Sequence, residues 1–175
     1  MKLKAIFSTA VLVVLITATL AASGGKLSDE QARTAFARLK GLTGEWQAVT
    51  DKGRSTIVYT ITAGGSAVVE HFTNPALPDN GDMITVYSLN GGQLELTHYC
   101  MAKNQPHMRA SSYDPRSGDL QFEFVDAGNL ASPADGHMHT AHFRFVDDQH
   151  FSSEWQFYQD GKPKMSEAFE FTRVR

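Results

Sequence analysis

Apolar and polar residues alternate along most of the chain from Gly44 onward, and Val, Ile, Thr, Phe and Tyr dominate the alternating segments. A period of two residues is typical of β-strands with one buried face. No helical pattern interrupts these segments, which favours a sandwich or an up-and-down barrel over parallel β-α-β units. We therefore expect an all-β fold, an antiparallel up-and-down barrel of about ten strands. The predicted strands cover residues 44–50, 54–62, 66–73, 82–88, 93–100, 106–113, 119–125, 138–147, 151–159 and 163–174.

One short helix is predicted before the strands. Ser28 is followed three residues later by Gln31, which is the spacing of a helix capping box. Apolar residues then recur at helical spacing from Ala32 to Leu39, and Gly41 follows. The change of period after Gly41 marks the start of the barrel.

The predicted connections alternate in length. Short turn sequences rich in Gly, Asn, Asp and Pro occupy residues 63–65, 90–92, 114–118 and 147–149. The connections between them include the longer segments 74–81, 101–105 and 126–137. Every second connection of a meander lies at the same end of the barrel. We therefore expect one tightly connected end and one looped end, with a binding mouth at the looped end.

The first residues predict export. Lys2 and Lys4 precede an uncharged apolar run that ends near Leu20 and is followed by small residues. This pattern is typical of a secretory signal peptide cleaved after Ala21, Ala22 or Ser23, and its apolar run is shorter than the roughly 20 residues of a membrane span. We expect a signal peptide at 1–22, an N-terminal segment with the short helix at 23–43 and a single barrel domain at 44–175. The mature protein is expected to be periplasmic or secreted, without a stable membrane span.

Composition narrows the choice of partners. The formal net charge is −3, charged residues make up 20% of the chain, and Lys and Arg form no cluster. We therefore expect no nucleic-acid partner and no anionic membrane surface. Cys100 is the only cysteine, so no internal disulfide can form. Its thiol is either buried and inert, paired with another molecule, or in contact with a ligand.

Two short features resemble the calycin superfamily. Gly44-Glu45-Trp46 opens the first strand directly after the helix and is similar to the lipocalin Gly-x-Trp signature. Arg173, near the end of the last strand, is placed like the basic residue that packs over that tryptophan in lipocalins. The chain departs from secreted lipocalins because it has no disulfide and about ten strands. The resemblance therefore implies a lipocalin-like or nitrobindin-like barrel, or a lipocalin-like protein exported by bacteria.

The candidate site lies at the looped end. His98 and Cys100 continue the inward apolar face of the strand that contains Leu96, because residues two apart share a face. His137 and His139 lie in phase with Phe143, and we expect them to point inward at the same end. Further candidates for ligand binding at this rim are the residues His107, Asn104, Gln105 and Trp155.

Several occupants of such a site remain open. Zinc or copper could be bound by His98, Cys100, His137 and His139. Haem could use one imidazole as its axial ligand. Nitrobindin-like proteins bind haem through a histidine near the C-terminal end, but the last histidine here is His150. A small apolar molecule requires only an apolar pocket with a few polar groups, and a self-filled barrel requires no ligand. The scattered methionines are interpreted as core residues.

The leading hypothesis is an exported binding protein that holds a small apolar ligand or cofactor at the looped end. An exported metal-dependent enzyme that uses the His/Cys cluster is one alternative. His137-x-His139 resembles part of the cupin metal motif, but Phe143 and Arg144 occupy the positions where its glutamate would follow. A barrel without ligand that acts through its surface is the other alternative.

Overall fold

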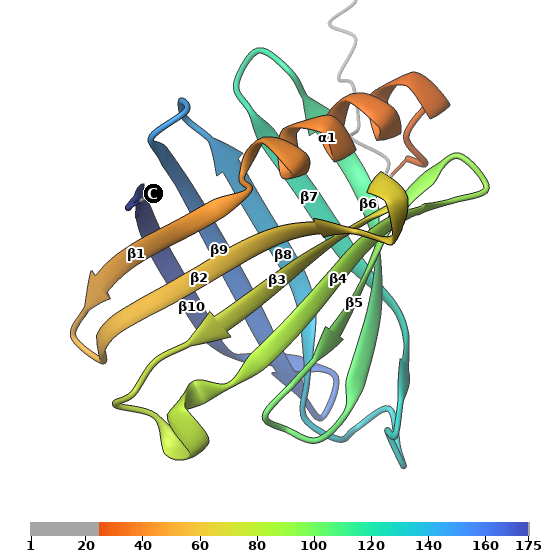
Figure 1. Ribbon diagram of the computed structural model, residues 1–175. Coiled ribbons are helices and arrows are strands. Elements are labelled where there is room, and N and C mark those ends of the chain that lie inside the picture. Colours follow the sequence, from red (N-terminus) through yellow and green to blue (C-terminus); the bar gives the residue numbers. More distant parts are fainter. Residues whose placement is uncertain (1–24, 175) are drawn as a thin grey trace, which may run out of the picture.

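The computed structural model describes residues 25–174 and shows a closed antiparallel barrel of ten strands. Each strand pairs with its neighbours in sequence, and β1 pairs with β10 to close the barrel (Figure 1). The predicted fold class is therefore confirmed. The elements are α1 (Asp29–Gly41), β1 (Gly44–Thr50), β2 (Gly53–Thr62), η1 (Ala63–Gly65), β3 (Ala67–Thr73), η2 (Pro78–Gly81), β4 (Met83–Asn90), β5 (Gln93–Tyr99), β6 (Gln105–Asp114), β7 (Asp119–Gly128), β8 (His137–Phe145), β9 (His150–Gln159) and β10 (Lys162–Arg173).

Helix α1 closes the end of the barrel that carries the tight turns (Figure 1). The predicted capping box is present: the Gln31 backbone N–H donates to Ser28 Oγ at 3.2 Å, and the Ser28 N–H donates to Gln31 Oε1 at 3.0 Å. One face of the helix is buried and includes Ala35, Phe36 and Leu39. Burial of this apolar face explains why a helix of 13 residues, which would be marginal alone in water, is stable here.

Trp46 and Arg173 contact each other at the end of the barrel that α1 covers. The Arg173 guanidinium lies 4.1 Å from the centre of the Trp46 ring, and the two residues are directly paired across β1 and β10. The guanidinium also donates to three backbone carbonyl oxygens, those of Gly41, Thr43 and Asp148, at 2.7–2.9 Å. The arginine predicted from the calycin resemblance therefore packs over the tryptophan as expected.

Aromatic side chains fill the half of the barrel nearest the helix. Phe151 stacks on Phe171 with ring centres 4.9 Å apart and meets the edge of Trp46 at 4.8 Å. Tyr87 and Phe143 are also buried. Interlocking rings of this kind leave little free space, because protein interiors pack as densely as organic crystals. This part of the barrel is a core, so any ligand must bind nearer the looped end.

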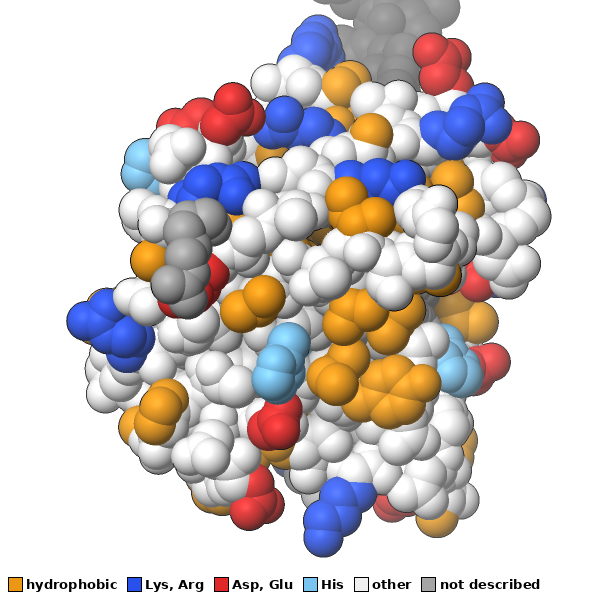
Figure 2. Space-filling model, viewed as in Figure 1, with side chains coloured by type: hydrophobic (Ala, Val, Ile, Leu, Met, Phe, Trp, Pro, Cys, Tyr) orange, Lys and Arg blue, Asp and Glu red, His pale blue; other side chains and the backbone are white. Residues whose placement is uncertain are grey.

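The outer surface carries one short apolar row. Val58, Ile84 and Tyr99 are exposed and lie in register across β2, β4 and β5, with His71 between them on β3. On the face shown in Figure 2, basic and acidic side chains are interspersed. Within residues 25–174, no helix has the length and apolar character needed to cross a membrane. The predicted signal peptide at 1–22 lies outside the described residues.

Candidate functional site

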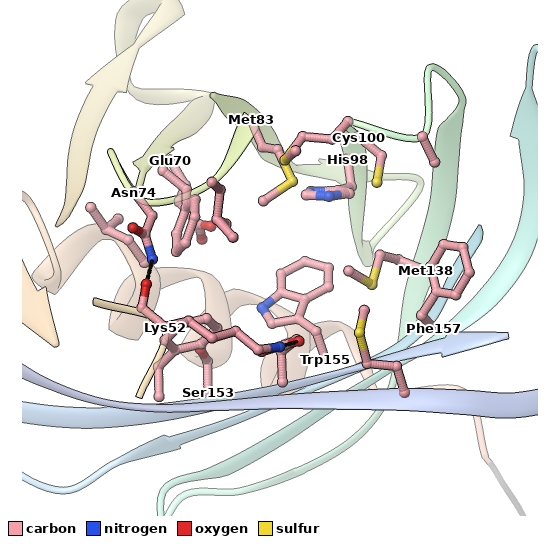
Figure 3. Close-up of a pocket in the computed structure, with 18 residues that line it drawn as sticks. Lys52, Glu70, Asn74, Met83, His98, Cys100, Met138, Ser153, Trp155 and Phe157 are labelled. Atoms are coloured by element: carbon pink, nitrogen blue, oxygen red, sulfur yellow. Dashed lines mark hydrogen bonds and ion pairs between the residues drawn. The ribbon is translucent and has the colours of Figure 1, made fainter. Parts of the chain in front are cut away.

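A cavity of about 350 Å³ occupies the barrel at the looped end, opposite α1 (Figure 3). Its wall is mostly apolar and is formed by side chains from β2, β3, β4, β5, β8, β9 and β10 and from the loops between them. The aromatic and aliphatic residues of this wall include Ile57, Phe72, Trp155, Phe157 and Phe169. Apolar pockets with few polar groups are the usual sites of small-molecule binding. Trp155 was among the residues expected to bind a ligand, and it lines this cavity.

His98 is the one histidine that lines the cavity in the described part of the chain. It is 4% exposed, and its Nδ1 lies 2.9 Å from Thr85 Oγ1. Its ring packs against Trp155 with centres 4.9 Å apart. Burial lowers the pKa of His98 from 6.5 to about 4, so the imidazole is neutral at pH 7. The other ring nitrogen, Nε2, is buried without a hydrogen-bond partner.

An unpartnered buried nitrogen is unusual and needs an explanation. Most buried polar atoms in folded proteins are hydrogen-bonded, because an unpaired one costs about 1–3 kcal/mol. His98 Nε2 belongs to a residue in the wall of an otherwise apolar cavity. It therefore has no hydrogen bond to lose when a polar group or metal ion enters the cavity.

A buried glutamate, Glu70, also lines the cavity and was not predicted from the sequence. Its Oε2 accepts hydrogen bonds from the hydroxyls of Tyr59 at 2.8 Å and Tyr87 at 2.6 Å. Burial raises the pKa of Glu70, and hydrogen bonds from Tyr87, Tyr59 and Thr85 oppose that rise. The sequence does contain a pattern that places Glu70 inside the barrel, because Val68, Glu70 and Phe72 alternate and so share one face of their strand. Val69, next to Val68, is also apolar, so the sequence alone does not show which of the two faces is buried.

Methionine sulfur atoms, which join the predicted Cys100, form a second feature that was not predicted from the sequence. Cys100 lines the cavity and is a free thiol whose pKa is raised by burial. Four methionines from four separate segments line the same cavity: Met83, Met101, Met138 and Met165. Along the sequence these residues are far apart, and only the closed barrel brings them together.

The mouth of the cavity carries an ion pair and an amide. Lys52 Nζ pairs with Glu167, and both residues belong to the lining. Asn74 donates from Nδ2 to the Lys52 carbonyl oxygen at 3.2 Å and to Ser55 Oγ at 3.2 Å. The Lys52 charge is thus neutralised by its neighbour, and the β1–β2 turn is tied to the loop after β3.

The expected inward orientation of His137 and His139 is wrong. The pairing of β8 with β9 shifts between Met138 and Thr140, which is a β-bulge. A bulge inserts one extra residue and reverses the alternation beyond it. Met138 therefore lines the cavity, whereas both histidines line a separate depression on the outer side of the wall.

On that outer side the two histidines contact each other and aromatic rings. His137 Nε2 lies 3.0 Å from His139 Nδ1. The His139 ring is stacked between Tyr158, with centres 4.0 Å apart, and Phe124, with centres 5.1 Å apart. Burial is the main cause of the lowered pKa of His139, and the neighbouring His137 lowers this pKa further. The pair is therefore held by its own contacts outside the cavity.

The remaining predicted residues surround the cavity without lining it. His107 is exposed and pairs with Asp126 on the outer surface. Asn104 is buried and donates to the Gly136 carbonyl oxygen at 2.8 Å, which joins the loop after β5 to the loop before β8. Gln105 is half-buried at the start of β6. These three side chains shape the loops at the mouth.

The four predicted metal ligands do not meet. His98 and Cys100 line the cavity, and His137 and His139 lie across the wall from it. Among residues 25–174, no three His, Cys, Asp or Glu side chains form a group that could hold a metal ion. The zinc set expected from these four residues is therefore not assembled, and a haem iron would find only the His98 imidazole in this cavity.

Comparison with known proteins adds no identification. No protein-family model matches the chain, and no curated protein matches it. The closed ten-stranded barrel with its Trp46–Arg173 contact is consistent with a calycin-like fold. The function must therefore be argued from the cavity itself.

Proposed function

We propose that this protein is an exported binding protein that holds a small, neutral, apolar molecule in the cavity at the looped end of its barrel. The observation that carries the proposal is the cavity of about 350 Å³ with a largely apolar wall. Export to the periplasm or out of the cell rests on the signal-peptide pattern of residues 1–22. Membership of the lipocalin-like or nitrobindin-like branch of the calycins is part of the same proposal.

The apolar wall supplies the affinity. A ligand that buries about 200 Å² of apolar surface gains roughly 5 kcal/mol before the entropic costs of association are subtracted. The half of the barrel near the helix is already packed with aromatic rings, so it provides a rigid floor. A preformed site of this kind avoids the cost of ordering flexible side chains when the ligand binds.

The polar groups favour a neutral ligand over a fatty acid or another anion. Lys52, the only cationic side chain that lines the cavity in the described chain, is paired with Glu167. Glu70 is engaged by two tyrosine hydroxyls, and a carboxylate entering nearby would meet a second carboxyl group. An apolar molecule that carries one hydroxyl or N–H group can instead donate to His98 Nε2.

Two adjacent serines provide a matched test. Ser153 is buried and lines the cavity, whereas Ser152 is half-buried on the opposite face of β9. Binding of N-phenyl-1-naphthylamine, a neutral apolar fluorescent probe, is measured by titration. We expect binding by the native protein, loss of at least about tenfold in affinity in Ser153→Phe, and little change in Ser152→Phe.

Competition then tests the ligand class. Decanol should displace the probe from the native protein more effectively than decanoate at the same concentration. If the probe does not bind, or if the two serine variants bind it equally well, the cavity is not the binding site. If decanoate competes better than decanol, the ligand is not neutral.

A further inference from the structure

We propose that the same cavity contains a site for a soft monovalent metal ion, Cu(I), formed by His98 Nε2, Cys100 Sγ and the thioether sulfurs of nearby methionines. The proposal does not depend on the binding of an apolar ligand, because a metal ion is held by bonds to ligand atoms and not by apolar contact. Three observations carry it: the distribution of sulfur, the unpaired ring nitrogen, and the finding that no three His, Cys, Asp or Glu side chains of the described residues form a metal-binding group.

Sulfur is concentrated in this one cavity. The described residues contain five methionines, and four of them line the cavity. The fifth, Met108, is buried in the barrel outside the cavity lining. The single cysteine also lines the cavity. In the view of Figure 3, the side chains of Met83 and Cys100 project on either side of the His98 ring, and Met138 faces them across the cavity.

The two ring nitrogens of His98 are arranged as in many metal-binding histidines: Nδ1 is hydrogen-bonded within the protein, and Nε2 is not. Its Nδ1 contacts Thr85 Oγ1 at 2.9 Å, and Thr85 itself hydrogen-bonds to the Glu70 carboxyl group. When Thr85 donates to Glu70, its oxygen accepts the Nδ1 proton, and the lone pair then lies on Nε2. That atom is buried without a partner. Metal-binding histidines usually have such a hydrogen bond on the other ring nitrogen, which fixes the tautomer and the ring orientation.

The available ligands select the ion. Thioethers, thiolates and imidazoles favour soft ions such as Cu(I), whereas Mg²⁺ and Ca²⁺ require several oxygen ligands. The residues described include no cluster of three His, Cys, Asp or Glu side chains, so a typical zinc set is lacking. Thioether sulfurs can supply the missing ligands for a soft ion such as Cu(I).

The charges balance when Cu(I) binds. The Cys100 thiol releases its proton to solvent as the S–Cu bond forms, so one positive charge replaces another and the oxidation state of copper does not change. His98 and the methionines bind as neutral ligands. The site is therefore electrically neutral inside an apolar cavity, where an uncompensated charge would be costly.

Cu(I) binding can be measured by competition with bathocuproine disulfonate under anaerobic, reducing conditions. We expect one equivalent of Cu(I) per protein. The double variant Met138→Leu/Met165→Leu and the single variant His98→Phe should each bind at least about tenfold more weakly. Met108→Leu is the matched control and should bind as tightly as the native protein. Exchanges of Met for Leu conserve volume and usually cost less than about 1.5 kcal/mol of stability, so folding should persist.

Three results would overturn the proposal: no Cu(I) retained against the competitor, equal weakening in Met108→Leu, or unchanged binding in both cavity variants. Probe binding separates this failure from that of the proposed function. The native protein is titrated with N-phenyl-1-naphthylamine in the absence of copper, because that measurement requires no metal ion. Cu(I) binding could then fail while apolar binding is retained, or the reverse.

Discussion

The buried, neutral imidazole of His98 predicts a specific loss of stability in acid. In the native protein its pKa is about 4, because burial disfavours the charged form, whereas an unperturbed histidine has a pKa of 6.5. Between these pH values the unfolded chain binds a proton that the native protein does not bind. The stability contributed by the low native pKa is therefore complete above pH 6.5 and is lost as the pH falls toward 4.

The size of the loss follows from the two pKa values of His98. A difference of this size corresponds to roughly 3 kcal/mol between pH 7 and pH 4. His98 is 4% exposed, so screening by solvent does not reduce this figure greatly. Two other titratable groups of the cavity, Cys100 and Glu70, remain present in the variant that tests the prediction. Thr85 hydrogen-bonds to both His98 and Glu70.

Urea unfolding at pH 7, 6, 5 and 4 tests this prediction on the native protein and on His98→Gln. The amide of glutamine can still bond to Thr85, and any cost that does not depend on pH cancels in the comparison. The native protein should lose roughly 3 kcal/mol more than His98→Gln over this range. Parallel pH curves for the native protein and His98→Gln would refute the reasoning.

Two other substitutions test the cavity floor and the closed end by urea unfolding. Glu70→Leu leaves the hydroxyls of Tyr59 and Tyr87 without an acceptor and should cost about 2–4 kcal/mol. Adding Tyr59→Phe and Tyr87→Phe should restore most of that loss, and no recovery would mean that the network does not act as a unit. Arg173→Ala removes the contact with Trp46 and three hydrogen bonds to carbonyl groups, so about 2–4 kcal/mol should be lost. Arg173→Lys should recover only part of it, and a loss below about 1 kcal/mol in Arg173→Ala would contradict the role of this arginine.

The strands and the helix were predictable because their signals are local. The alternation of apolar residues identifies every strand, and the ends observed differ from those predicted by no more than three residues. The capping box of Ser28 and Gln31 marks the start of α1. The Trp46–Arg173 contact could also be expected, because both residues lie at identifiable ends of their strands.

The site was predictable only in part. The residues that line it depend on which face of each strand points inward and on how the strands come together when the barrel closes. His98 and Trp155 line the cavity because the alternation in β5 and β9 is unbroken there, and Cys100 follows directly after β5 in the same phase as His98. The bulge in β8 turned His137 and His139 outward, and no residue type in that segment announces a bulge. Strand registers across the barrel bring the cavity methionines together, and no sequence pattern within one strand reports those registers.

The binding surface of the cavity can be observed directly through its methionine methyl groups. The protein is labelled with ¹³C at the methionine methyl groups, and N-phenyl-1-naphthylamine is added while the NMR signals are followed. Our account predicts that the signals of the four cavity methionines shift together as the probe binds, whereas that of Met108 changes little. Unchanged cavity signals at saturating probe, or an equal shift of the Met108 signal, would contradict the claim that this cavity is the binding site.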